Sequence, residues 1–216
     1  MRQEGLTALL EPTPIFTSNK SFAGACAIAA ASLFSSAASA NIIMVSDGAL
    51  FGDIVAGSGG SLDHEFFAGY SGYYGSGLAG GTGNGAWTAS ASGGLYADGG
   101  IMSTNFGGEA LTLSFASADV FAIGGNFFNT AADFSTTPSL IQVQVNNISY
   151  VFFADGNDFS GFISTSGAIQ AITFTPYGSG SASKFASTDH VVVGAIPSPA
   201  ALALGALAGL IRRRRR

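Results

Sequence analysis

Short segments in which apolar and polar side chains alternate recur between residues 110 and 175. In 141–145, Ile141, Val143 and Val145 alternate with Gln142 and Gln144. Successive side chains of a strand point to opposite faces, so a period of two is typical of a strand with one face buried. Similar alternation occurs in 110–115, 149–153 and 169–175. Many short strands of this kind predict an antiparallel sandwich.

Turn residues separate these segments. Asn146 and Asn147 lie between two alternating runs, and asparagine tolerates the positive φ that a tight hairpin needs. The segment 155–158, Asp-Gly-Asn-Asp, marks another turn. We expect the core strands to come from 121–128, 159–163 and 169–174. The sequence therefore predicts an all-β fold, an antiparallel β-sandwich of jelly-roll-like form, with few helical segments outside the two chain ends.

The stretch 57–108 is rich in glycine and serine, which predicts either long loops with short strands such as 86–92 or a partly disordered segment, although its aromatic residues argue against a pure linker. Aromatic residues are scattered through it: Tyr70, Tyr73, Tyr74, Trp87 and Tyr96. Tyr70, Tyr73, Tyr74 and Trp87 could stack on sugar rings, because aromatic faces offer amphipathic contact area. Packing inside the sandwich is the alternative for these four residues, and the favoured one.

Charge is distributed unevenly along the chain. Between residues 41 and 195 the sequence has one basic residue, Lys184, against eleven acidic ones, which gives this part a net charge of −10. One lysine cannot neutralise a phosphate backbone, so nucleic acid is excluded as a partner. This part also has no cysteine, so its stability must come from burial and backbone pairing.

The N-terminal segment has the parts of a secretory signal peptide. Lys20 precedes an apolar stretch, 22–34, and Ala38-Ser39-Ala40 supplies the small residues of a cleavage site after Ala40. Residues 1–19 contain two glutamates and form an atypical N-terminal extension. We therefore expect residues 1–40 to be removed and residues 41–195 to form the exported domain.

The C-terminal segment, 196–216, has three parts. Ile-Pro-Ser-Pro (196–199) comes first, and an uncharged run, 200–211, follows it. Five arginines end the chain: Arg212, Arg213, Arg214, Arg215 and Arg216. The prolines predict a helix that begins after them, and the arginines hold that end on the cytoplasmic side. The helix would span about 18 Å against about 30 Å of hydrocarbon, which suits a temporary membrane anchor.

This order of parts resembles the PEP-CTERM sorting tail. The sorting residues would be Pro197, Ser198, Pro199 and the arginines 212–216, with Ser198 in the place of the family's glutamate. The resemblance implies an exported bacterial protein that is processed by signal peptidase and an exosortase, and transiently inserted in the inner membrane by its C-terminal helix. The run of 121–128, 159–164, 169–174 and 185–193 is similar to the β-sandwich body of such proteins, which implies a fold and an address in the cell envelope or outside the cell.

Several short motifs resemble sites that carry chemistry. Residues 75–80 fit G-x-G-x-x-G but lack the flanking strand and helix of a dinucleotide site. The two histidines, His64 and His190, would need a distant carboxylate to make a zinc site, and His190 beside Asp189 reads as a strand-edge residue. Asp155, Asn157 and Asp158, with Asp189, are candidates for a weak calcium site, although a turn explains the first three. No cofactor is expected.

The sequence favours a non-enzymatic surface or matrix protein that engages exopolysaccharide. The alternative is a secreted polysaccharide-acting hydrolase, which usually needs two carboxylates held at a set separation across a cleft. Eleven acidic residues in 41–195 allow such a pair. None of the eleven stands in a recognisable catalytic motif, so the pair cannot be named from the sequence.

Overall fold

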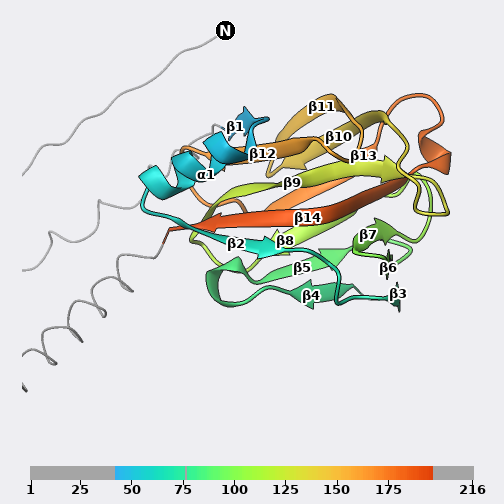
Figure 1. Ribbon diagram of the computed structural model, residues 1–216, viewed down its shortest axis with the longest axis horizontal. Coiled ribbons are helices and arrows are strands. Elements are labelled where there is room, and N and C mark those ends of the chain that lie inside the picture. Colours follow the sequence, from blue (N-terminus) through green and yellow to red (C-terminus); the bar gives the residue numbers. More distant parts are fainter. Residues whose placement is uncertain (1–41, 76, 197–216) are drawn as a thin grey trace, which may run out of the picture. The chain divides into compact units, whose positions relative to one another are not determined.

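Two antiparallel β-sheets packed face to face form the body of the protein (Figure 1). The computed structural model describes residues 42–75 and 77–196. The predicted signal peptide, the sorting tail and the short C-terminal helix lie outside these residues. Within the described residues, no helix has the length and apolarity needed to cross a membrane.

The first sheet, sheet A, has its strands in the order β1-β12-β9-β14-β7-β6-β3, and β2 also pairs with β14. Its strands are β1 (Ile42–Val45), β2 (Ser61–Glu65), β3 (Gly72–Tyr74), β6 (Leu95–Asp98), β7 (Ile101–Thr104), β9 (Val120–Thr130), β12 (Phe159–Ser164) and β14 (Phe185–Ala195). Strand β14 is central. It pairs with β9 along one side, and with β7 and then β2 along the other.

The second sheet, sheet B, runs in the order β11-β10-β13-β8-β5-β4. Its strands are β4 (Leu78–Gly80), β5 (Trp87–Ser90), β8 (Leu111–Phe115), β10 (Ser139–Val145), β11 (Ile148–Ala154) and β13 (Ala171–Pro176). Two short 3-10 turns, η1 (Gly83–Gly85) and η2 (Ser181–Ser183), lie in the connections. The alternating segments of the sequence therefore form the strands predicted for them.

The predicted hairpin is confirmed. Asn146 and Asn147 join β10 to β11, and Asn146 has a φ of 52°. The side chain of Asn146 also closes the neighbouring connection, because its Nδ2 donates to the carbonyl of Ala168 and its Oδ1 accepts from the backbone N–H of Gln170. One asparagine thus sets the hairpin and ties it to β13.

The core lies between the sheets, and the predicted core strands supply much of it. Ile123 and Phe127 on β9, Phe162 on β12 and Phe174 on β13 are all buried. The rings of Phe127 and Phe174 lie 5.1 Å apart, centroid to centroid, across the two sheets. Ile141, Val143 and Val145, which alternate with the glutamines of β10, are fully buried as predicted.

Two parts of the chain differ from the sequence-based expectation. The stretch 57–108 has the short strands and loops expected of it, but it carries six strands, β2 to β7, because tertiary pairing supplies hydrogen bonds that a glycine-rich sequence does not predict. A helix, α1 (Gly48–Gly57), also precedes β2. Asp47 caps it by accepting from the backbone N–H groups of Ala49 and Leu50.

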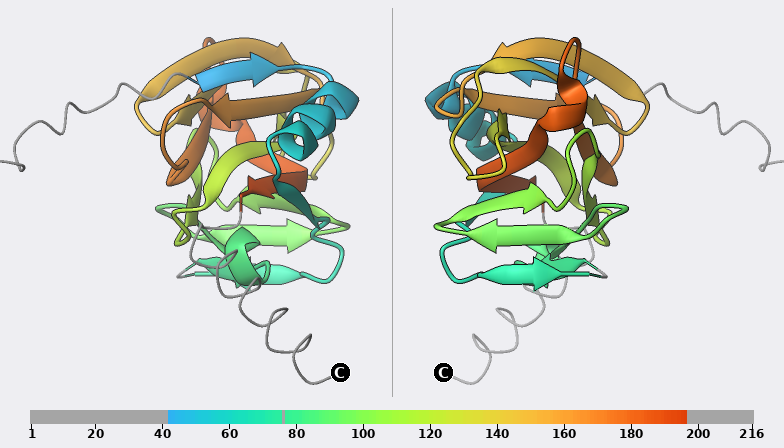
Figure 2. Two further views of the ribbon diagram at one scale, coloured as in Figure 1. Left: turned by 90° about the vertical axis from the view of Figure 1, so that its left-hand side faces the viewer. Right: turned by 90° about the vertical axis from the view of Figure 1, so that its right-hand side faces the viewer.

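Helix α1 covers part of the outer face of sheet A, the face that points away from sheet B (Figure 2). Its buried residues are Phe51 and Val55. The Phe51 ring lies directly over Gly161 of the sheet, where no side chain would fit, because an added Cβ atom would lie 2.4 Å from that ring. Glycines on β9 and β12 therefore let the helix approach the sheet closely.

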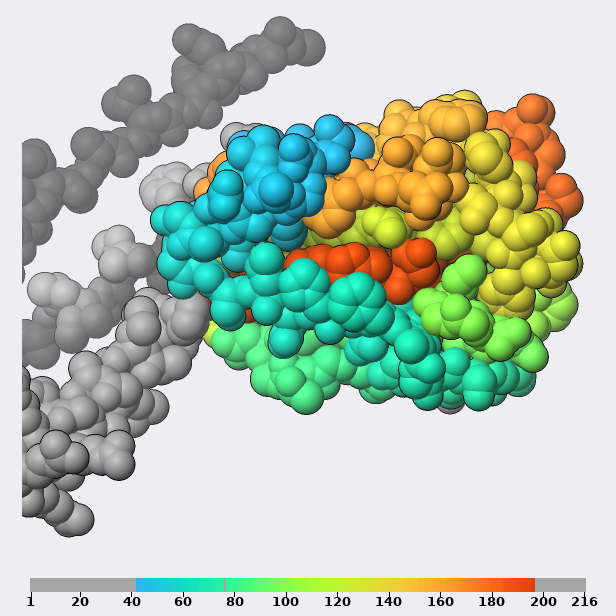
Figure 3. Space-filling view, in the orientation of Figure 1, coloured from blue at the N-terminus to red at the C-terminus, as the bar shows by residue number. Residues whose placement is uncertain are grey.

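Beyond α1, the outer face of sheet A is open. The space-filling view shows β14 and β9 as the floor of a furrow, with α1 and β1 along one bank and β2 along the other (Figure 3). Sheet A therefore presents to solvent a face that is covered at one end and concave along its length.

Candidate functional site

A hollow of about 320 Å³ lies on the outer face of sheet A, at the end away from α1. Strands β6, β7 and β14 form its floor, and the loop that joins β9 to β10 overhangs it. The lining side chains are Tyr96, Asp98, Ser103, Thr104, Asn105, Ala131, Ala132, Phe134 and Phe185. Aromatic and polar groups therefore meet in one concave site.

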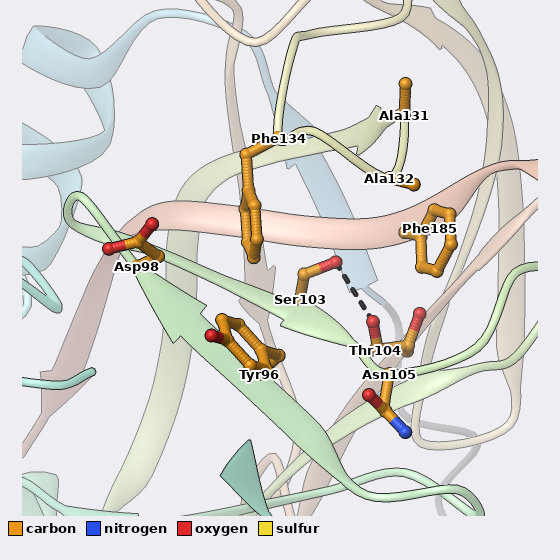
Figure 4. A pocket seen from close by; sticks show the side chains of 9 residues that line it. All are labelled: Tyr96, Asp98, Ser103, Thr104, Asn105, Ala131, Ala132, Phe134 and Phe185. Atoms are coloured by element: carbon orange, nitrogen blue, oxygen red, sulfur yellow. Dashed lines mark hydrogen bonds between the residues drawn. The ribbon is translucent and has the colours of Figure 1, made fainter. Parts of the chain in front are cut away.

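Two aromatic rings face each other across this hollow. Tyr96, on β6, and Phe134, on the β9–β10 loop, have ring centroids 5.7 Å apart and planes inclined by 45°. Figure 4 shows Ser103 between them, Asp98 at one end, and Phe185 with Asn105 at the other. Tyr96 is 39% exposed, so a face of its ring remains available to a ligand.

The backbone of Phe134 has the left-handed conformation, with a φ of 64°. Its N–H donates to the carbonyl of Ala131, and the N–H of Ala131 donates to the carbonyl of Ser135. This is a hairpin loop in which a turn is followed by a left-handed residue, a position that usually holds glycine. A bulky residue there costs about 1–2 kcal/mol, so the fold by itself does not favour phenylalanine.

Asp133 fixes the loop next to Phe134. One oxygen of its carboxylate accepts from both the hydroxyl and the backbone N–H of Ser135. These hydrogen bonds lower the pKa of Asp133 below the usual range of aspartate. The bond from the Ser135 hydroxyl has the larger effect, and the bond from the backbone N–H has the smaller one. The loop conformation that holds Phe134 over the hollow is thus maintained by its own side chains.

A row of buried hydroxyl groups supports the floor. Thr130 on β9, Ser187 on β14 and Ser103 on β7 are almost completely buried. Their hydroxyl oxygens are linked in that order by hydrogen bonds of 2.8 and 2.9 Å. The hydroxyl of Ser103 lines the hollow, and its own donor is directed to the carbonyl of Thr104. The floor is polar yet rigid, since each hydroxyl has a partner.

The tyrosines predicted to stack on sugars have different places. Tyr73, on β3, is paired in register with Tyr96, so the two side chains share the outer face of sheet A beside the hollow. Tyr73 is 58% exposed, and its hydroxyl donates to the carbonyl of Gly93. Tyr74 is half-buried and bonds to Ser71. Of the predicted residues, Tyr73 alone neighbours this site in the described chain.

Tyr70 and Trp87 lie elsewhere, in a cluster with Phe67. The Trp87 ring is edge-on to both aromatic neighbours, with centroid distances of 5.6 Å to Phe67 and 6.3 Å to Tyr70. Trp87 is 3% exposed, so little of its ring can meet a ligand. Burial, with Glu65 adding to it, raises the pKa of Tyr70. Of the two alternatives for Trp87, stacking on a sugar or packing inside the sandwich, the structure shows packing.

A second hollow, of about 410 Å³, lies next to this cluster. It is lined by Asp63, His64, Glu65, Tyr70, Gly80, Gly81, Thr82, Gly85, Trp87 and Val193. Asp63 and Glu65 are two residues apart on β2, so their side chains leave the strand on the same face. Two carboxylates therefore reach one hollow.

The weak calcium candidates lie in two places. Asp155 accepts from the backbone N–H of Asn157 in the turn between β11 and β12, as expected of a turn. Asp189 lies on β14 instead. Within residues 42–75 and 77–196, no three side chains among His, Cys, Asp and Glu converge on a position for a metal ion.

The glycines of 75–80 precede or belong to β4, and β5 follows them after η1. A dinucleotide site would require a helix at that place. Gly77 has a φ of 110°, and a Cβ atom there would lie 2.6 Å from the carbonyl oxygen of Ala89. Gly77 therefore serves the backbone of this edge.

The two histidines are brought together. The Nδ1 atom of His64 lies 3.0 Å from the Nε2 atom of His190 on the outer face of sheet A. The interpretation of His190 as a strand-edge residue fits only in part: β14 is an inner strand, but at His190 it pairs with β9 alone, because β7 pairs up to Thr188 and β2 from Val191 onward. Register between β2 and β14, which the sequence does not reveal, places the two residues side by side.

Comparison with known proteins gives structural likeness only. No family model matches the sequence, and no curated protein does. A family 29 carbohydrate-binding module has a TM-score of 0.37 at 10% identity, over 62% of this chain and 91% of that one. A family two carbohydrate esterase from Cellvibrio japonicus has a TM-score of 0.37 at 9% identity, over 65% of this chain.

An exo-β-1,3-galactanase from Phanerochaete chrysosporium has a TM-score of 0.29 at 20% identity, over 55% of this chain. The matched part spans 36% of the esterase and 29% of the galactanase. These likenesses concern the sandwich alone.

The sequence does not identify the three aromatic residues of the first hollow, Tyr96, Phe134 and Phe185, as site residues. Tyr96 and Phe134 belong to segments that are 38 positions apart, and Phe185 begins the last strand. One signal was available. The turn-forming segment 131–135 contains a large aromatic residue, which a turn does not require.

Proposed function

We propose that this chain is an exported, non-enzymatic protein that binds a neutral polysaccharide through the hollow lined by Tyr96 and Phe134. The observation that supports this most is the left-handed backbone of Phe134. A bulky residue held in a conformation that suits glycine marks a functional requirement, because the strain persists only where something else selects the side chain.

The chemistry of the hollow suits a sugar. The rings of Tyr96 and Phe134 offer apolar faces against the C–H faces of a sugar ring. The side chains of Asp98 and Asn105 supply polar groups for the sugar hydroxyls. The volume of about 320 Å³ is at the low end for small-ligand sites, which fits a short stretch of a longer polymer.

Charge narrows the class of polysaccharide. The exported part has eleven acidic residues and one lysine, and Asp98 lines the hollow itself. A polyanionic polymer would be repelled by this charge. We therefore propose an uncharged exopolysaccharide as the ligand.

The address is part of the same proposal. The signal peptide at 1–40 and the PEP-CTERM-like tail at 196–216 would deliver the β-sandwich to the cell surface or the extracellular matrix. The tail would be held for a time in the inner membrane, where an exosortase processes it. A binding function fits such an address, because a matrix protein needs contact with the polymer rather than turnover of it.

Affinity electrophoresis of the full chain in gels that contain neutral polysaccharides tests the proposal. We expect retardation that Tyr96→Ala and Phe134→Ala each reduce at least tenfold in affinity. Phe153→Ala is the matched control, since Phe153 is 60% exposed and lies on sheet B. Retardation that survives in both hollow variants, or none with any neutral polymer, contradicts the proposal.

The second hollow supports a hydrolase as the competing proposal. Asp63 and Glu65 leave the same face of β2 with their backbones about 6.7 Å apart, and glycosidases use a pair of carboxyl groups. Release of reducing sugar from a neutral polymer, abolished by Asp63→Asn and Glu65→Gln but not by Phe134→Ala, would favour this function over binding.

A further inference from the structure

Two imidazole nitrogens face each other on the open face of sheet A. His64 Nδ1 and His190 Nε2 are 3.0 Å apart, although the residues are 126 positions apart in the sequence. The chain has no other histidine. In the absence of a bound ion, one nitrogen must carry the proton that the other accepts.

The same separation suits a shared metal ion. Nitrogen ligands lie about 2.0–2.1 Å from a Zn²⁺ ion, so two of them at an angle of about 90–110° are roughly 2.9–3.4 Å apart. The observed distance of 3.0 Å falls in this range. An ion bound by both nitrogens would take the place of the shared proton.

The rings are held in place before any ion binds. Phe66 stacks on His190 with a centroid distance of 4.3 Å and an interplanar angle of 3°. The planes of His64 and His190 are inclined by only 11°. Pairing of His64 with Val192 fixes the register of the two strands, so the two imidazoles cannot slide apart.

A break in the sheet creates the position of His190. Strand β7 pairs with Ser187 and Thr188 on β14, and β2 pairs with β14 from Val191 onward. The register of β14 against β9 shifts between Thr188 and His190, which leaves Asp189 as an extra residue. Such a bulge re-aims side chains, and bulges are frequent near functional sites.

A carboxylate oxygen without a partner lies beside the histidines. Oδ1 of Asp189 is buried and has no hydrogen-bond partner among the described residues. Asn126 donates to the same carboxylate, and Asp189 interacts electrostatically with His190. A buried oxygen of this kind normally has a partner, so a nearby positive charge would compensate it.

We propose that His64 and His190 bind one late transition-metal ion, Cu²⁺, Ni²⁺ or Zn²⁺, through Nδ1 of His64 and Nε2 of His190. Imidazole suits these ions, whereas Ca²⁺ and Mg²⁺ prefer oxygen ligands. Asp189 is not a third ligand, since no group of three converges in residues 42–75 and 77–196. Water fills the remaining positions, and the acidic body attracts the cation.

Metal titration of the full chain, purified without a histidine tag and with Cys26→Ser, tests this site. We expect one Cu²⁺ or Zn²⁺ per chain in competition with a coloured chelator. His64→Gln and His190→Gln should each weaken the affinity at least tenfold, and the double variant should lose the binding. The electron paramagnetic resonance spectrum of the Cu²⁺ form should show coupling to two nitrogen nuclei.

Controls separate this site from binding by carboxylates. Asp155→Asn with Asp158→Asn should leave the affinity unchanged, and an excess of Ca²⁺ should not displace Cu²⁺ or Zn²⁺. Circular dichroism checks that the glutamine variants keep the wild-type fold. Undiminished binding in a folded double variant, no measurable binding by the wild type, or a spectrum with oxygen ligands alone overturns the proposal.

Discussion

The ring of Phe134 lies 5.7 Å from the ring of Tyr96, measured between centroids, and it reaches this position from a backbone that has a φ of 64°. A loop of this form would be relaxed with glycine at residue 134. The contact between the two rings thus depends on a local conformation that phenylalanine disfavours, and stability and binding are expected to respond to its replacement in opposite directions.

Phe134→Gly should leave the free energy of unfolding unchanged or raise it by up to about 1 kcal/mol, because glycine removes the strain of the left-handed conformation. The same change should weaken polysaccharide binding at least tenfold, since the ring is lost. Urea denaturation and affinity electrophoresis on one preparation measure both effects. A clear loss of stability would mean that the Phe134 ring serves packing.

Gly161→Ala should lower the free energy of unfolding by about 1–3 kcal/mol, because the added methyl group would meet the Phe51 ring and push α1 from the sheet. Gly57→Ala is the control. Gly57 is the last residue of α1, and a Cβ atom added there would have no other atom within 4 Å. Denaturant midpoints of the two variants should move in different directions, and equal shifts would refute close packing of α1.

Phe174→Ala should cost about 3–5 kcal/mol, because Phe174 is fully buried and faces Phe127 across the core. Gly77→Ala should also be destabilising, since Gly77 has a positive φ and the added atom would meet the Ala89 carbonyl. If Gly77 served only the flexibility of the loop, the substitution would be harmless. Chemical denaturation should rank Phe174→Ala as the more harmful. The reverse order would place the core elsewhere.

Asp189→Asn should stabilise the metal-free protein at neutral pH and have little effect in acid. Burial raises the pKa of Asp189 above its unfolded value. As the pH rises, the unfolded chain releases this proton first, so folding becomes less favourable until the folded-state pKa is passed. Thermal melting of both proteins in chelator, from acid to neutral pH, should show that the stabilisation by Asp189→Asn grows with pH. A gain that is the same at every pH would contradict the burial argument.

Replacing Arg212, Arg213, Arg214, Arg215 and Arg216 with serine should misdirect the protein in a host that has an exosortase, because the orientation signal is lost. N-terminal sequencing of wild-type surface protein should begin near Asn41. Mass spectrometry of that material should show a processed tail. Mature protein that still ends in five arginines would rule out the processing step.

Local pattern was enough for much of the sandwich. The alternation in β10, β11 and β13 predicts their faces, and Asn146 predicts the hairpin, because side-chain period and turn chemistry are properties of neighbouring residues. The local pattern does not predict helix α1, because its apolar residues stand among glycines. The helix forms through the Asp47 cap and through the contact of Phe51 with sheet A.

Each candidate site joins residues that are far apart in the sequence, so local pattern does not predict it. Composition alone predicts that nucleic acid is not a partner, since residues 41–195 contain one lysine and eleven acidic residues. Only strand order places Tyr96 under Phe134, and only the register of β2 on β14 places His64 beside His190. Register is fixed by burial of whole sheet faces, so no short segment carries it, and the tertiary structure had to decide which side chains meet.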